Sequence, residues 1–220
     1  MDDTRGDHSL ALTAGHCVID KGKFATMWTF IPEYDSNPVA YNNCNANRWG
    51  CWTAEALYVH ENFAAQRQFN TTAVTHDFAF ALLGLGGKSG ESKSLETTVG
   101  GNFAISFTGP LTGTTLTALG YPAGAPYDGS QLTYCQGPIG QDSRVNNATW
   151  KMACDMTGGS SGGPWGDGYM DDYSDTLRSL NSYGYSGEAY MYGPKFNSKT
   201  AAVYNAANSG LITNTRVTGG

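Results

Sequence analysis

Long hydrophobic runs are missing from this sequence, and charged residues are sparse. No stretch approaches the roughly 20 apolar residues of a membrane-spanning helix, and residues 2–7 are polar, so no signal peptide is evident. Charged residues make up 15% of the chain, and 19 acidic residues against 13 basic ones give a net charge of −6. No basic run offers a surface to nucleic acid or to an anionic membrane. We therefore expect neither of these as a partner.

Metal-binding patterns are also missing. The five cysteines form no CxxC pair, and no HExxH segment occurs, so a zinc site is not indicated. No organic cofactor is implied either. Histidine is scarce, with four in the chain, namely His8, His16, His60 and His76.

Three short segments carry residues that are typical of nucleophilic acyl transfer. In order they supply a histidine, an aspartate and a serine: His16, Asp77 and Ser161. A serine hydroxyl is a weak nucleophile at neutral pH and needs a base, usually histidine, whose tautomer is fixed by a carboxylate. The segments are LTAGHC over 12–17, HDFAFA over 76–81 and TGGSSGGP over 157–164.

Glycines surround the candidate nucleophile on both sides. Glycine permits backbone angles that side chains forbid, so a sharp turn can form around Ser161. Such a turn would point the N–H groups of Gly159 and Ser161 at one spot beside the hydroxyl, where they would stabilise the oxyanion of a tetrahedral intermediate. We therefore expect these two residues to form an oxyanion hole.

Two other classes of serine hydrolase fit the order of these residues poorly. The GSSGG segment also matches the nucleophile elbow of α/β-hydrolases, but that fold places its histidine after the serine, and all four histidines here precede Ser161. A subtilisin-like order needs aspartate, histidine and then serine. Asp7 or Asp20 with His60 would satisfy that order, yet neither aspartate has a supporting motif.

With these motifs, the chain resembles serine proteases of the trypsin/chymotrypsin type. It is most similar to the secreted microbial branch that includes glutamyl endopeptidases, over residues 10–193 and the C-terminal helix. The resemblance implies an all-β fold of two antiparallel six-stranded barrels, with the active site in the cleft between them. Only residues 1–9 precede Leu10, so the first barrel is expected to be incomplete and to lack its N-terminal strands.

Apolar runs separated by turn-forming residues predict a succession of strands. We expect an N-terminal barrel over 1–88 with His16 and Asp77, a C-terminal barrel over 89–220 with Ser161, and a glycine- and serine-rich linker near 84–102. A helix is expected over about 197–208. The expected strands are 25–31, 54–59, 78–83, 105–107, 114–119, 132–135, 177–183 and 188–192.

The cysteines point to an oxidising compartment. Cys44 and Cys51 could close a small loop, and Cys135 and Cys154 flank the segment that leads to the nucleophile, so both pairs could be disulfides. In the family the cysteine after the catalytic histidine usually pairs with one upstream. No cysteine precedes Cys17 here, so its partner stays open.

The resemblance also suggests where substrate binds. Ser182, Tyr183 and Gly184 resemble the strand that holds the substrate backbone, and Gly193 is expected on the opposite wall of the specificity pocket. Asp155 stands six residues before Ser161, where trypsins keep the acid that selects arginine or lysine. The glutamyl endopeptidase branch can also carry an aspartate there, and it uses a histidine about where Asn181 falls. Basic and acidic selectivity both stay open.

From the sequence we expect a secreted, monomeric serine endopeptidase that acts on proteins or peptides through an acyl-enzyme on Ser161. The alternative is a catalytically inactive protease-fold binding module or truncated homologue, because the motifs alone do not separate an active enzyme from an inactive descendant.

Overall fold

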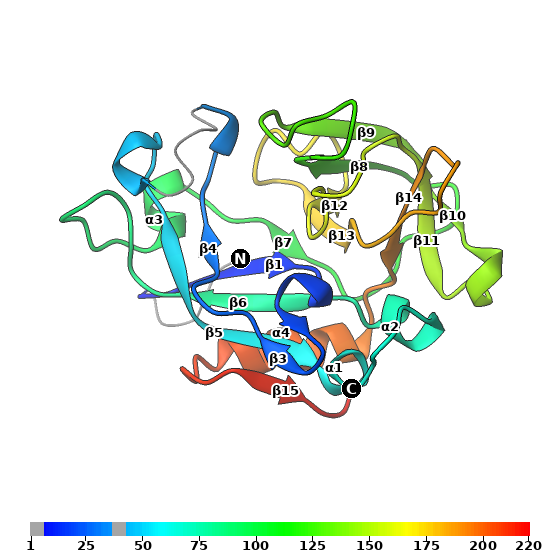
Figure 1. The fold of residues 1–220 in the computed structure, drawn as a ribbon, viewed down its shortest axis with the longest axis horizontal. Coiled ribbons are helices and arrows are strands. Elements are labelled where there is room, and N and C mark those ends of the chain that lie inside the picture. Colours follow the sequence, from blue (N-terminus) through cyan, green and yellow to red (C-terminus); the bar gives the residue numbers. More distant parts are fainter. Residues whose placement is uncertain (1–6, 37–42) are drawn as a thin grey trace.

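Two β-rich halves make up the molecule. The computed structural model describes residues 7–36 and 43–220, and Figure 1 shows one half at the lower left and the other at the upper right. The first half holds the long strands near the N-terminus, and the second holds those of the C-terminal part of the chain. This arrangement agrees with the expected all-β fold of chymotrypsin type.

The sheet of the first half has the order β1-β6-β5-β15, with β4 also pairing with β5. Neighbouring strands are antiparallel, except that β15 runs parallel to β5. All residues of β6 are buried, which explains why its sequence AFALL is continuously apolar rather than alternating. The strands are β1 (Ser9–Thr13), β4 (Thr29–Phe30), β5 (Trp52–His60), β6 (Ala79–Leu83) and β15 (Thr215–Val217).

The second half contains a five-stranded sheet in the order β7-β13-β12-β8-β9 and a three-stranded sheet in the order β10-β11-β14. Apolar side chains from both sheets, including Trp165 and Met152, form one core. The strands are β7 (Ala104–Ile105), β8 (Thr115–Gly120), β9 (Thr133–Pro138), β10 (Gly140–Gln141), β11 (Thr149–Ala153), β12 (Pro164–Gly166), β13 (Thr176–Leu180) and β14 (Tyr190–Pro194).

Short helices and one small hairpin complete the described fold. The hairpin pairs β2 with β3 and follows the His16 segment directly. Helices α1 and α2 lie between β5 and β6, so they border the segment that carries Asp77. The remaining elements are β2 (Ile19–Asp20), β3 (Lys23–Phe24), α1 (Glu61–Ala64), α2 (Thr71–Thr75), α3 (Leu95–Val99) and α4 (Ser198–Asn208). No helix in the described part of the chain is long and apolar enough to cross a membrane.

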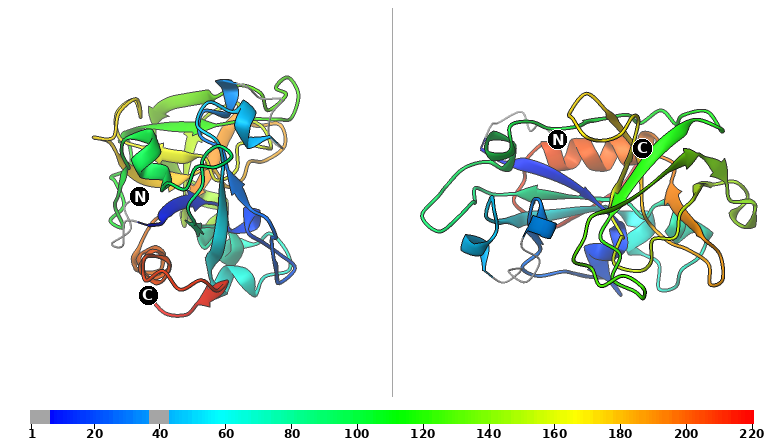
Figure 2. Two further views of the ribbon diagram at one scale, coloured as in Figure 1. Left: turned by 90° about the vertical axis from the view of Figure 1, so that its left-hand side faces the viewer. Right: turned by 90° about the horizontal axis from the view of Figure 1, so that it is seen from above.

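The C-terminal helix forms where the sequence predicted it. Asn197 caps α4 by accepting hydrogen bonds from the N–H groups of Lys199 and Thr200. Its buried face, with Val203 and Ala207, joins the core of the first half together with Phe196, which precedes the helix. Figure 2 (left) shows α4 and β15 together at the lower end of the molecule, away from the second half. The end of the chain therefore packs on the sheet formed by its beginning.

The segment expected as a linker has structure of its own. Gly86 pairs with Lys93, Gly87 pairs with Cys51, and α3 begins after Ser94, whose hydroxyl accepts the N–H of Thr97. This segment therefore belongs to the folded first half, and the division of the chain near residue 88 stays a proposal.

Both expected disulfides are present. Cys44 is bonded to Cys51, and Cys135 of β9 is bonded to Cys154, which follows β11. Cys17 is in no disulfide within the described residues.

We predict that Leu82→Ala lowers the free energy of unfolding by about 2–5 kcal/mol, because Leu82 is fully buried in the core that β6 shares with α4. Leu85 is 49% exposed, three residues away, and Leu85→Ala is the matched control with an expected change within about 0.5 kcal/mol. Urea unfolding of the two variants would measure this. Equal stabilities would contradict the packing described.

Candidate active site

The imidazole of His16 and the carboxylate of Asp77 meet at the edge of the first half. His16 lies in a 3₁₀ turn, Gly15–Cys17, that follows β1, and Asp77 lies just before β6, the neighbour of β1. Gly15 is required because a Cβ there would lie 2.8 Å from a ring carbon of Phe63 and 3.1 Å from Oδ1 of Asp77. The antiparallel pairing of β1 with β6 therefore brings together residues 61 positions apart.

Asp77 is fully buried, and its carboxylate accepts three hydrogen bonds. The His16 backbone N–H donates to Oδ1 at 2.8 Å, His16 Nδ1 lies 2.7 Å from Oδ2, and Ser182 Oγ donates to Oδ2 at 2.5 Å. A buried carboxylate accepts the Nδ1 proton, which leaves Nε2 free to act as a base. Asp77 therefore fixes both the orientation and the tautomer of His16.

The pKa of His16 reflects two opposing effects. Burial lowers it, but the hydrogen bond and the negative charge of Asp77, with a contribution from the neighbouring Cys17 side chain, outweigh burial and raise the pKa above its ordinary value. The His16 side chain remains 34% exposed, so it faces the space where a substrate would bind. Since only neutral imidazole accepts a proton, the raised pKa moves the acid limit of activity to higher pH.

The turn around Ser161 is held by hydrogen bonds on both sides. Ser160 Oγ donates to the Thr157 carbonyl at 2.8 Å, and the N–H of Gly163 donates to the Ser160 carbonyl at 3.1 Å. A Cβ on Gly162 would lie 2.6 Å from Oγ1 of Thr13, three residues before His16. The candidate nucleophile is therefore next in sequence to a glycine that packs directly against the His16 segment.

The expected oxyanion donors lie in a turn that contains a glycine with positive φ. Gly159 has a φ of +103°, and a Cβ there would lie 2.8 Å from both the N and the Cβ of Ala123. The Gly158 carbonyl accepts a hydrogen bond from the N–H of Ala123 at 2.7 Å. Within the described residues, no hydrogen bond uses the N–H of Gly159 or of Ser161. Both donors are available to a ligand.

The segment after β13 supplies an open strand edge. The N–H groups of Ser182 and Tyr183 donate to the Tyr192 carbonyl at 2.9 and 3.2 Å. In the described structure, the Ser182 carbonyl and both backbone groups of Gly184 have no partner. An extended peptide can add to such an edge. The expectation of a substrate-binding strand therefore fits this geometry, whereas the hydrogen bond from Ser182 to Asp77 was not foreseen.

Two other expected positions differ in their surroundings. Asp155 is exposed and accepts a hydrogen bond from Tyr127, which raises the pKa of that phenol. Gly193 lies in β14, where a Cβ would be 2.1 Å from the Leu180 carbonyl. Close packing against β13 requires a glycine here, and its place in the pocket wall stays a prediction.

Asn181 entered the sequence analysis only as the position near which the glutamyl endopeptidase branch has a histidine. It is fully buried, and its Nδ2 donates to the carbonyls of Leu119 and Ser160 at 2.7 and 3.0 Å. Its Oδ1 accepts the indole N–H of Trp165 at 2.6 Å. Asn181 therefore stabilises the nucleophile turn through its hydrogen bond to the Ser160 carbonyl. No local sequence signal announces such a contact.

Two bacterial enzymes of known structure are similar to this chain over nearly its whole length. The protease Anisep from Arthrobacter nicotinovorans shares 31% identity with a TM-score of 0.76, covering 95% of this chain and 86% of that one. The thermostable serine protease AL20 from an extremophilic microorganism shares 32% identity with a TM-score of 0.76, covering 95% and 88%. The chain belongs to the trypsin/chymotrypsin-like serine proteases of microbial type.

More distant relatives of this serine protease share its fold. A Glu endopeptidase has 21% identity and a TM-score of 0.64 over 91% of this chain and 81% of its own, and the scabies mite inactivated protease paralogue S-I1 has 13% identity and a TM-score of 0.55 over 91% and 84%. No family model and no curated protein matches the sequence.

The histidines of this protease should titrate in an order set by their partners. We predict a pKa above 6.5 for His16, next to Asp77, and pKa values below 6.5 for His60 and His76, which burial and the nearby Lys199 charge lower. NMR titration of the imidazole resonances would measure all three.

Removal of the carboxylate tests the cause of the His16 shift. Asp77→Asn should lower the pKa of His16, whereas Asp172→Asn, a change at an exposed aspartate, should leave it in place. A His16 that titrates below 6.5, or that does not respond to Asp77→Asn, would contradict the hydrogen-bonded pair.

Proposed function

We propose that this protease is an endopeptidase that hydrolyses peptide bonds through an acyl-enzyme on Ser161. The observation that carries the proposal is the hydrogen-bond chain from Ser182 through Asp77 to His16, beside which the Ser161 turn packs. A buried carboxylate, an imidazole with a free Nε2 and a serine in a tight glycine turn are the parts that acyl transfer needs.

Each group then has a distinct role in the reaction. Ser161 Oγ attacks the peptide carbonyl while His16 Nε2 takes its proton, and the proton later passes to the leaving amine. Asp77 stabilises the imidazolium that forms between these steps. The N–H groups of Gly159 and Ser161 stabilise the oxyanion, each contributing about 2.7–4 kcal/mol to the transition state. Water then cleaves the acyl-enzyme by the same route.

The substrate is a protein or a peptide in an extended conformation. Its backbone would pair with the Ser182 carbonyl and with Gly184, the groups that are unpaired in the described structure. The exposed carboxylate of Asp155 favours a basic side chain at the residue that carries the scissile carbonyl. The buried amide of Asn181, with all its polar atoms engaged, supplies no cation for an acidic one.

The two disulfides support a place outside the reducing cytoplasm, and we propose a secreted enzyme that acts as a monomer. The disulfides join residues within each half, so they hold each half in the conformation that presents its part of the site.

A fluorophosphonate probe tests the proposed nucleophile directly. We predict that the probe labels the wild-type protein at Ser161 and that peptide mapping excludes the adjacent Ser160. Ser161→Ala should abolish labelling and lower peptide hydrolysis by several orders of magnitude without unfolding, because its side chain makes no hydrogen bond among the described residues.

Ser186→Ala, a change at an exposed serine, is the control and should label like wild type. A folded wild-type protein that resists the probe and cleaves no peptide would support the alternative function, an inactive protease-fold binding module.

A further inference from the structure

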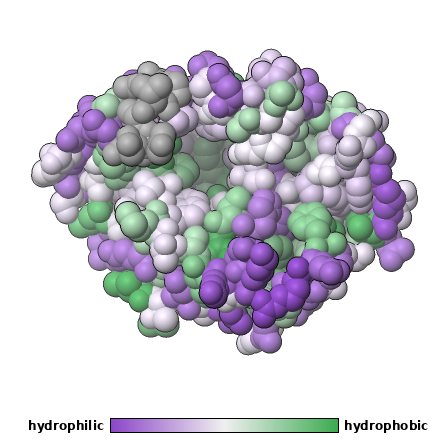
Figure 3. Space-filling view, viewed as in Figure 1, coloured by the Kyte–Doolittle hydropathy of each residue, from purple (hydrophilic) through white to green (hydrophobic). Residues whose placement is uncertain are grey.

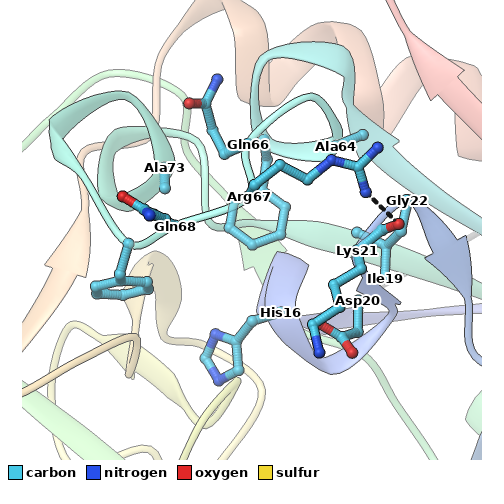
Figure 4. Close-up of a pocket in the computed structure, with 12 residues that line it drawn as sticks. His16, Ile19, Asp20, Lys21, Gly22, Ala64, Gln66, Arg67, Gln68 and Ala73 are labelled. Carbon is cyan, nitrogen blue, oxygen red and sulfur yellow. Dashed lines mark hydrogen bonds between the residues drawn. The ribbon is translucent and has the colours of Figure 1, made fainter.

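A pocket of about 220 Å³ opens beside His16. Figure 4 shows that it lies between the turn of the β2–β3 hairpin and the segment between α1 and α2. Its floor is apolar and includes Phe63, Ala64 and Ala73, while its rim is polar. In Figure 3 hydrophilic side chains gather on this lower central face, below the hollow between the two halves. The pocket is large enough for one amino-acid side chain.

The wall of this pocket continues into the proposed substrate-binding strand. Phe69, which lines the pocket, packs edge-on against Tyr183 with ring centroids 5.4 Å apart. Side chains of an extended peptide point alternately to opposite sides. If the residue with the scissile carbonyl points toward Asp155, the preceding residue points the other way, past His16 and into this pocket.

The hairpin turn that carries Lys21 is fixed from two directions. Arg67 donates to the Lys21 carbonyl, and Arg216 of β15 donates to the Gly22 carbonyl at 2.6 Å. Lys21 and Gly22 have φ values of +48° and +82°, as the tightest hairpin turns require. The turn is therefore a rigid mount for the Lys21 side chain, which in Figure 4 extends toward His16.

The charges that line the pocket favour an anion. Lys21 and Arg67 are cationic, and Asp20 is the lining carboxylate. The other polar side chains are the His16 imidazole and the neutral amides of Gln66 and Gln68. In the part of the chain that the structure describes, Lys21 forms no ion pair. Its ammonium is available to a ligand.

We propose that Lys21 selects an acidic side chain in the substrate residue that precedes the one with the scissile carbonyl. The proposal rests on the endopeptidase function given above. The apolar floor would contact the methylene groups of a glutamate, and the Lys21 ammonium at the rim would pair with its carboxylate. The negative charge of Asp20 repels an acidic side chain, so it reduces the preference that Lys21 and Arg67 create without reversing it.

Three peptides test the proposal. They carry glutamate, glutamine or lysine at the residue that precedes the one with the scissile carbonyl. The other positions are kept constant, with the residue at the scissile carbonyl chosen from a first screen of wild-type cleavage. Glutamine matches glutamate in shape, so their ratio isolates charge. We expect kcat/KM for the glutamate peptide to exceed that for the glutamine peptide roughly two- to fivefold, as for a partly exposed ion pair, and the lysine peptide to be slowest. Added salt should reduce the ratio.

Charge reversal at two lysines of the same hairpin gives the decisive comparison. Lys21→Glu should reverse the order, so that the lysine peptide is cleaved faster than the glutamate peptide, and Lys21→Arg should keep the wild-type order. Lys23→Glu changes the net charge equally at an exposed residue that does not line the pocket, and it should also keep the order.

The failures of the two proposals are distinguishable. Equal rates for the three peptides, or an order that Lys21→Glu leaves unchanged, would overturn the selectivity while leaving the endopeptidase function intact. Equal effects of Lys21→Glu and Lys23→Glu would show a long-range effect of charge and would also overturn it. If no peptide is cleaved and the fluorophosphonate does not label Ser161, the endopeptidase function fails and the selectivity fails with it.

Discussion

The buried carboxylate of Asp77 is the constraint on which the site depends. An unpaired charge in the protein interior costs several kcal/mol, so the folded state must provide donors for Asp77. They come from His16, which follows β1, and from Ser182, which follows β13 in the other half. The requirement to satisfy one buried charge therefore aligns the two halves and sets the position of the imidazole.

The same short segment also holds the nucleophile. The Asn181 side-chain amide donates to the carbonyl of Ser160, and the Asn181 backbone carbonyl accepts the N–H of Gly162. The hydroxyl of the next residue, Ser182, donates to Asp77. Two consecutive residues thus fix both the base and the serine turn. The segment after β13 therefore links the serine turn to the carboxylate that orients the base.

The sequence predicted the parts of this structure that have local signals. Continuous apolar runs located β5 and β6, the capping residue located α4, and cysteine spacing located both disulfides. Two-residue strands such as β10 have no such signal, and β15 pairs with β5 through only three residues. The Ser182 hydroxyl reaches Asp77 across 105 positions, a contact that only the packed halves define. Segment 84–102 looked like a linker because glycine and serine dominate it, but its bridges to Cys51 and within itself are made by backbone groups.

The end of the chain bears on the site through the hairpin beside His16. Strand β15 contributes Arg216, which holds the Gly22 carbonyl 194 positions away, and Arg67 holds the adjacent carbonyl of Lys21. A residue in the left-handed region, as Lys21 is, keeps its conformation only when its surroundings hold it there. The two arginines supply that support from the backbone side and leave the Lys21 side chain directed at the cleft. Strand β15 therefore helps to hold the hairpin turn that carries Lys21, although no residue of β15 lines the pocket.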